Sequence, residues 1–280
     1  MNPVLKVENL ITTATRRGLE NTVVDGVSFA IPAGGSLAIV GESGAGKSML
    51  IRSILGIRPP GVSMRVSGRV LLDGHDILSL RGRDHRQALA RSVGMVHQDP
   101  LRSLNPTFRV GTQLTESLSF AGVGGGRRGR ASRAVDAMRK VGFRNPDAES
   151  RRYPHELSGG QRQRIGISAA TLAEPALLIG DEPTTALDVT VQKRVLDLMD
   201  EMRERTGASL LLVTHDLGVA AERCEEIIVM RAGKIVEAGP TSTMLSAPSH
   251  PYTRGLLESI PRLDGPRPHR LLTSAEGALS

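Results

Sequence analysis

Short apolar runs alternate with longer segments of helical period through the second half of the chain. The runs Leu177–Ile179, Leu210–Val213 and Ile227–Met230 have the length and composition of buried strands. Between them, Thr190–Arg205 and Leu217–Arg223 have the pattern of helices. Strands that alternate with helices in this way predict a mostly parallel sheet with helices packed on it.

The first hundred residues contain mainly strand signals. We predict strands at residues 4–10, 22–31, 36–40, 65–73 and 93–96, and one helix at residues 47–55. The segment SLAIV at residues 36–40 is short and almost entirely apolar, which predicts a buried strand.

The pattern changes between residues 99 and 157. Strand signals are absent there, and Val110–Phe120 and Ala131–Val141 predict helices. The stretch GVGGGRRGR at residues 122–130 predicts a mobile, solvated loop, with contact to lipid headgroups as the alternative. Beyond Pro240 the many prolines indicate a tail. We therefore expect an α/β core with a helical insertion.

Composition places the chain among globular proteins. Its 280 residues are 39% hydrophobic and 23% charged, and they are enough to bury a sizeable core. The longest apolar runs fall far short of the roughly 20 residues that a membrane helix needs. The start, MNPVLKVENL, lacks the pattern of a secretory signal. The single cysteine, Cys224, excludes an internal disulfide and fits a reducing cytoplasm.

The net charge of +7 and the pI near 10.3 bear on possible partners. Such a balance indicates either a solvated, arginine-rich surface or attraction to an anionic membrane surface. Aromatic residues make up only 2% of the chain, and no basic stripe is interleaved with stacking residues. We therefore expect no binding of nucleic acid.

The strongest chemical signal is GESGAGKS at residues 41–48, which matches G-x-x-x-x-G-K-[ST] between a predicted strand and a predicted helix. Backbone N–H groups of such a loop wrap the phosphates of a nucleoside triphosphate, and the helix N-terminus adds its positive end. Lys47 is expected to reach the β and γ phosphates, and Ser48 to ligate Mg²⁺. The expected phosphate-binding residues are Gly41, Ser43, Gly44, Ala45, Gly46, Lys47 and Ser48.

Two carboxylates, Asp181 and Glu182, follow the apolar run ALLI. The carboxyl end of a buried strand is where open α/β sheets bind ligands. We expect Asp181 to hold Mg²⁺, directly or through water. Glu182 is expected to polarise the water that attacks the γ-phosphate.

A third motif, LSGGQ at residues 157–161, lies between the other two and predicts a helix start with Ser158 as its N-cap. Together the three motifs resemble the ATP-binding cassette (ABC) ATPases, and the resemblance extends from about Leu5 to Pro261. It implies that this segment covers the γ-phosphate bound by a second subunit, so that two chains complete their sites head to tail. The implied contact residues are Ser158, Gly159, Gly160 and Gln161.

Smaller motifs agree with the resemblance. It implies that Gln98, after a predicted strand, contacts Mg²⁺ and the attacking water, and that His215 contacts the γ-phosphate. The resemblance also implies that Asp188, in the segment TALD, lies where this segment reaches the partner subunit beside the nucleotide. The implied catalytic residues are thus Glu182, His215 and Gln98, and the implied cofactors are ATP and Mg²⁺.

The resemblance also implies an architecture. The implied fold is α/β. Its core is a mostly parallel sheet of the P-loop (RecA-like) type, to which an N-terminal antiparallel β part and an inserted α-helical subdomain are added. The expected boundaries are 1–98 and 158–245 for the ATP-binding core, 99–157 for the helical subdomain, and 246–280 for a C-terminal tail with the HPYT segment.

Two stretches, residues 98–116 and His250–Arg254, resemble the ATP-binding subunits of oligopeptide and dipeptide importers, a subgroup that also serves nickel and other small solutes. This resemblance implies a peripheral ATPase at the cytoplasmic face of the inner membrane that powers solute import. The implied partners are membrane permease subunits, a second ATP-binding subunit, identical or similar, and indirectly a solute-binding protein.

Other functions are compatible with part of the pattern. Relatives of the same subgroup also serve in soluble assemblies, such as a phosphonate-cleaving complex, so an ATPase without transport is the alternative. An ATPase acting on DNA is not expected, because the stretch between residues 48 and 157 cannot supply a long coiled coil.

The adenine contact is the least defined part of the expected site. ABC ATPases commonly place an aromatic residue near the end of the first strand, but residues 10–17 contain none. The base is expected to rest on Ala14, on threonine methyl groups, or on the plane of Arg16 or Arg17.

Overall fold

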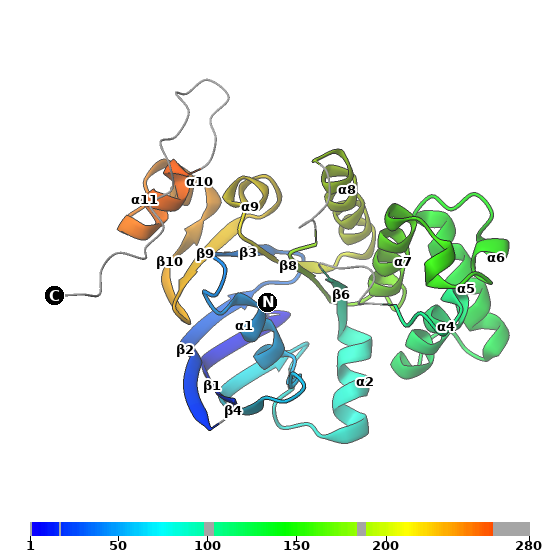
Figure 1. Cartoon of the computed structure of the whole chain (residues 1–280), viewed down its shortest axis with the longest axis horizontal. Coiled ribbons are helices and arrows are strands. Elements are labelled where there is room, and N and C mark those ends of the chain that lie inside the picture. Colours follow the sequence, from blue (N-terminus) through cyan, green and yellow to red (C-terminus); the bar gives the residue numbers. More distant parts are fainter. Residues whose placement is uncertain (1, 17, 98–103, 184–188, 260–280) are drawn as a thin grey trace.

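The computed structural model describes residues 2–16, 18–97, 104–183 and 189–259, which form two sheets and a set of helices (Figure 1). The smaller sheet is antiparallel and has four strands in the order β2-β1-β4-β5. Its strands are β1 (Leu5–Arg16), β2 (Leu19–Ile31), β4 (Ser63–Leu72) and β5 (His75–Asp76).

The larger sheet has six strands in the order β10-β9-β3-β8-β7-β6. Every neighbouring pair is parallel except β9 and β10, which form an antiparallel hairpin. The strands are β3 (Ser36–Val40), β6 (Val93–His97), β7 (Leu177–Asp181), β8 (Ser209–Thr214), β9 (Glu226–Arg231) and β10 (Lys234–Pro240). The predicted α/β class, with a mostly parallel sheet and an N-terminal antiparallel part, is confirmed.

Helices surround the larger sheet and extend from it on one side (Figure 1). Outside the segment between β6 and β7, the described helices are α1 (Lys47–Ile54), α2 (Gly82–Ser92), α8 (Val189–Thr206), α9 (Leu217–Arg223), α10 (Thr241–Ser246) and α11 (Pro251–Glu258). The helices between β6 and β7 are α4 (Val110–Ala121), α5 (Arg127–Lys140), α6 (Pro146–Glu149), the 3₁₀ turn Pro154–Glu156 and α7 (Gly159–Thr171).

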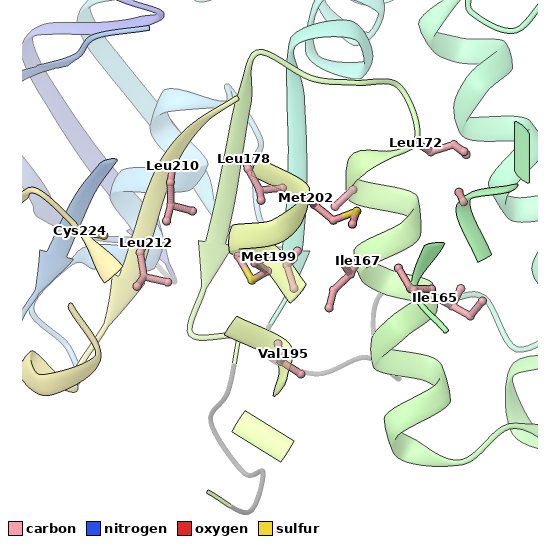
Figure 2. Packing of buried hydrophobic residues seen from close by; sticks show 14 of the residues in the cluster. Ile165, Ile167, Leu172, Leu178, Val195, Met199, Met202, Leu210, Leu212 and Cys224 are labelled. Carbon is pink, nitrogen blue, oxygen red and sulfur yellow. The ribbon is translucent and has the colours of Figure 1, made fainter. Parts of the chain in front are cut away.

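Alternation along the buried strands divides the interior into two cores. Leu37 and Ile39 of β3 face a core shared with α1 and the antiparallel sheet, whereas Ala38 and Val40 face a core shared with α7, α8 and α9. In the second core, Met199 of α8 lies close to the sheet residue Leu212 (Figure 2). Strands buried on both faces explain the continuous apolar runs in the sequence.

The structure corrects several predicted elements. Strand β1 continues to Arg16, and α2, β5, β10, α10 and α11 were not predicted. The predicted loop at residues 122–130 is wrong at its end, because α5 already begins at Arg127. Its small and apolar residues Ala134, Ala137 and Met138 are buried on one face, and this packing stabilises a helix despite the glycines before it.

None of the helices in the described ranges is both long and apolar enough to cross a membrane.

Candidate nucleotide site

Three neighbouring parallel strands, β3, β8 and β7, end at one edge of the larger sheet. The glycine loop 41–46 follows β3, Asp181 and Glu182 lie at the end of β7, and His215 follows β8. Parallel topology therefore brings together residues that are more than a hundred positions apart in the sequence.

The glycines of the loop are required by backbone geometry. Gly44 and Gly46 have φ angles of 87° and 103°, in the left-handed region that side chains disfavour. A Cβ atom on Gly41 would lie 2.3 Å from the carbonyl oxygen of Met230, and one on Gly46 would lie 2.6 Å from that of Val23. The loop is thus pressed against two strands and can adopt this shape only with glycine at these positions.

Lys47 is buried at the base of the loop, with 4% of its side chain exposed. Its Nζ donates hydrogen bonds to the carbonyl oxygens of Gly41 (2.6 Å) and Glu42 (3.0 Å), and it lies 3.8 Å from Oε1 of Glu182. Burial lowers the pKa of Lys47, while the carboxylates of Glu182 and Asp181 oppose this shift. The ammonium group is therefore poised beside the loop, where phosphate would stabilise its charge.

Ser48 and Asp181 form an oxygen pair suited to a hard cation. The Ser48 hydroxyl donates to Oδ1 of Asp181 over 3.4 Å. Burial raises the pKa of Asp181, and the hydrogen bond from Ser48 counteracts that shift. Mg²⁺ prefers oxygen ligands and usually completes its octahedron with water and substrate phosphates. The pair fits such an ion, which when bound would neutralise phosphate charge.

Glu182 is held in an uncommon backbone conformation, with φ at +48°. Its N–H donates to the carbonyl of Val213 on β8 (2.8 Å), which fixes the residue at the strand end. Its Oε2 lies 3.5 Å from Nδ1 of the half-exposed His215. A non-glycine residue in the left-handed region is costly, and such residues cluster at functional sites. Glu182 thus lies between Lys47 and His215.

A cavity of about 700 Å³ opens over the loop. Its wall includes the phosphate loop, Glu182, the β9–β10 turn at residues 232–233 and the β2 residues Asn21, Thr22 and Val23. Ala14 lies opposite Asn21 in the β1–β2 pair but is not itself a lining residue. The sequence pattern missed these three β2 residues, although they would have followed from the register of the hairpin.

The LSGGQ segment does not line this cavity. Ser158 caps α7 by accepting from the N–H of Gln161 (3.2 Å), and the Gln161 side chain accepts from the N–H of Ser158 (2.9 Å). Gly159 and Gly160 have open space where a Cβ atom would lie. The segment therefore presents a rigid, uncovered helix start.

The predicted site residues Gln98 and Asp188 lie outside the described residues. The remaining predicted residues fall into two places. Residues 41–48, Asp181, Glu182 and His215 lie at one edge of the sheet, and residues 158–161 lie at the start of α7.

The glycine loop, the strand-end carboxylates and the parallel sheet define a P-loop nucleotide-binding protein. The chain matches the ABC transporter family over residues 24–185 and the oligopeptide/dipeptide transporter C-terminal region over residues 236–279. It belongs to the ABC transporter family, as its motifs predicted. ATP and Mg²⁺ are the cofactors that membership of this family implies.

Relatives and solved structures agree with this assignment. The chain is 42% identical over 264 residues to the dipeptide transport ATP-binding protein DppD of Bacillus subtilis (strain 168), covering 94% of this chain and 78% of that protein. It is also 42% identical to the oligopeptide transport ATP-binding protein OppD of the same organism, covering 93% and 73%. The dimeric structure of MJ0796, a bacterial ABC transporter cassette, superposes with a TM-score of 0.72 at 25% identity, covering 85% and 98%.

Proposed function

We propose that this chain is the ATP-hydrolysing subunit of an importer for peptides or similar small solutes, bound to a membrane permease at the cytoplasmic face of the inner membrane. The observation that carries the proposal is the convergence of Lys47, Ser48, Asp181, Glu182 and His215 at one sheet edge. The names of the two Bacillus relatives support the transport role. Neither relative supports a soluble, non-transport assembly.

Each side chain at the edge has a distinct task in this proposal. Lys47 binds the β and γ phosphates, and Ser48 and Asp181 hold the metal ion. Glu182 accepts the proton of the attacking water, and His215 lies within reach of the γ-phosphate. In the same proposal, Gln98 contacts the metal ion and the attacking water.

A second ATP-binding subunit, identical or similar, completes the site. Ser158, Gly159, Gly160 and Gln161 lie outside the cavity of their own chain, and the start of α7 is open to solvent. A hydroxyl, free N–H groups and the helix dipole suit an anion. In a head-to-tail pair, this segment and Asp188 contact the nucleotide held by the partner. The structure of the cassette MJ0796 is dimeric, which supports pairing of two such subunits.

An apolar groove of about 620 Å³ supports the contact with the permease. Leu89 of α2 and Met95 of β6 line it on the sheet side, and Phe120 of α4 and Ala169 of α7 line it on the helical side. Phe120 is 55% exposed, although a large aromatic side chain gains most from burial. A helix of the permease in this groove would contact both parts, so that a movement between them reaches the membrane.

Replacing Phe120 by Asp is expected to detach the chain from its permease. A charge in an apolar interface loses burial energy and adds a desolvation cost, so we expect the amount of chain retained by tagged permease to fall about tenfold. Phe108→Asp is the matched control, because Phe108 is 50% exposed and lies outside the groove. ATP binding by both purified variants should equal that of the wild type. If tagged permease retained both variants equally, the groove would not be the docking site.

Transport itself is tested in vesicles. The chain, its permease subunits and a solute-binding protein are reconstituted, and uptake of labelled di- and oligopeptides is measured with and without ATP. ATP-dependent uptake is the expected result. A chain that hydrolyses ATP but stays in the soluble fraction with other enzymes would favour the alternative, an ATPase of a soluble complex.

Selectivity for the base is expected to be weak, because the phosphate contacts are the same for any triphosphate and no aromatic residue lies in residues 10–17. We expect GTP to bind within about tenfold of ATP, a difference of roughly 1.4 kcal/mol. Ala14 shares a face with its pair partner Asn21, which lines the cavity, so Ala14→Tyr should stack on adenine and tighten ATP binding by roughly 0.5–1.5 kcal/mol.

Competition binding of ATP and GTP checks this expectation. Thr15→Tyr is the matched control, because the next residue of a strand points to the opposite face. A wild-type preference for ATP of more than about a hundredfold, or roughly 2.7 kcal/mol, would show that another group already recognises the base.

A further inference from the structure

The C-terminal helix α11 reaches back to the phosphate loop through Tyr252. The backbone N–H of Glu42, the second residue of the loop, donates to the Tyr252 hydroxyl over 3.1 Å. The two residues are 210 positions apart, so the contact joins the last described helix to the first nucleotide motif. None of the roles proposed above for the nucleotide site uses this hydroxyl.

The peptide unit that Tyr252 contacts is also held by Lys47. The carbonyl oxygen of Gly41 accepts from Nζ of Lys47 (2.6 Å), and the N–H of the same peptide unit, that of Glu42, donates to Tyr252. Because a peptide unit is planar, hydrogen bonds at both of its ends fix its orientation. When Lys47 turns towards phosphate, its hydrogen bonds to the carbonyl oxygens of the loop weaken. The hydrogen bond to Tyr252 then still holds the Gly41–Glu42 peptide unit.

The tyrosine ring is itself fixed. The guanidinium of Arg231, at the end of β9, lies 4.9 Å from the ring centroid, which is the distance of a cation–π contact. The preceding residue of that strand, Met230, has its carbonyl oxygen packed against Gly41. The end of β9 therefore supports both the loop and the ring, so the hydroxyl has little freedom to move away from Glu42.

The sequence around Tyr252 explains how α11 presents this side chain. Nδ1 of His250 accepts from the N–H of Tyr252 (3.1 Å) and caps the helix, and Pro251 occupies its first turn. Glu237 of β10 fastens the same end, since its carboxylate accepts from the N–H (2.6 Å) and hydroxyl (2.7 Å) of Ser249 and from the N–H of His250 (3.1 Å). Helix start and sheet are thus joined by three hydrogen bonds.

We propose that Tyr252 is a positioning residue of the nucleotide site: its hydroxyl holds the Gly41–Glu42 peptide in the shape that receives phosphates, and so makes ATP affinity depend on where α11 lies. The inference rests on the proposed function, because it requires that the loop binds a nucleotide. The effect is on binding, since the hydroxyl acts through the loop and touches no reacting atom.

The test compares nucleotide binding by the full chain and its Tyr252→Phe variant, using calorimetry with MgATP, MgADP and AMP. The variant keeps the ring and its contact with Arg231 and loses only the hydroxyl. We expect affinity for ATP and ADP to fall about three- to tenfold, the effect of one lost hydrogen bond, and affinity for AMP to stay unchanged because AMP lacks the phosphates that the loop wraps. In the transporter, KM for ATP should rise by the same factor with kcat within about twofold.

Two further variants separate positioning from general stability. Ser259→Ala removes a hydroxyl from the end of the same helix, where it donates only within the helix, and should leave affinity unchanged. Glu237→Ala releases the start of α11 while keeping Tyr252, and should weaken ATP binding in a way that is not additive with Tyr252→Phe.

Three results would overturn the inference: a Tyr252→Phe variant that binds ATP as the wild type does, an equal loss for AMP, or an equal loss in Ser259→Ala. A wild-type chain that binds no ATP would instead overturn the proposed function, so the two failures are distinguishable.

Discussion

Replacing Lys47 by Ala is expected to weaken ATP binding by about 100-fold or more, or roughly 2.7 kcal/mol. Lys47 carries the buried ammonium group of the phosphate loop and lies at its base. Hydrogen bonds to charged groups contribute roughly 1.5–3 kcal/mol each, and an ammonium between the β and γ phosphates makes more than one. Equilibrium binding of labelled ATP to the full chain measures the loss.

The matched control is Lys193→Ala, which removes the same charge from the exposed face of α8. It should leave the affinity unchanged. Because Lys47 also donates to the carbonyls of Gly41 and Glu42, a melting curve must show that the Lys47→Ala variant remains folded. A folded variant with wild-type affinity would mean that the nucleotide binds elsewhere.

Much of the core followed from the sequence, because strands buried on both faces leave an unambiguous apolar run. The predicted strands 36–40 and 177–179 are of this kind, and both proved to be interior strands of the larger sheet. Their carboxyl ends carry the glycine loop and the carboxylates, so strand order alone placed Lys47 near Glu182. For this part of the site, sequence pattern and topology were sufficient.

The elements that were missed are those whose stability depends on distant contacts. Helix α2 has no fully buried residue, and its Ala88 and Leu89 pack only partly buried against the core. Helix α11 is only eight residues long, and its start depends on the His250 cap and on Glu237 of another strand. The contact with Glu237 comes from another part of the chain, so local pattern alone could not predict this helix. The contact between Tyr252 and Glu42 could not be predicted from local pattern either, because the two residues are 210 positions apart.

The residues expected beside the adenine base show a different limit of prediction from sequence. Sequence reasoning followed the first strand and expected the base on Ala14, on threonine methyl groups, or on the plane of Arg16 or Arg17. It did not include Asn21, Thr22 and Val23 of the second strand, which line the cavity. Counted from the turn, the β1–β2 register is regular and places Asn21 opposite Ala14, but counted from the start of the strand it is broken by three shifts between Val7 and Thr13. Irregularities of this kind change which residues face a site and are not encoded in alternation alone.

Replacing Glu182 by Gln is expected to keep ATP bound while turnover falls by about 100-fold to 10,000-fold, the usual contribution of a general base. The amide has the same shape and cannot accept a proton. Glu182 stands between Lys47 and His215 at the strand end, and its left-handed φ fixes where the side chain starts. Phosphate release in reconstituted transporters measures turnover, and filter binding measures retained ATP.

The same variant tests the proposed head-to-tail pair. ATP that is bound and not hydrolysed would hold two chains together through the segment 158–161 of each, so size-exclusion chromatography with MgATP should show a dimer for Glu182→Gln and a monomer without nucleotide. The matched control is Glu174→Gln, which makes the same change at an exposed residue that also has a positive φ. It should keep wild-type turnover and show no trapped dimer. A Glu182→Gln variant that is active and monomeric would remove Glu182 as the base, because the proton of the attacking water would then have another acceptor.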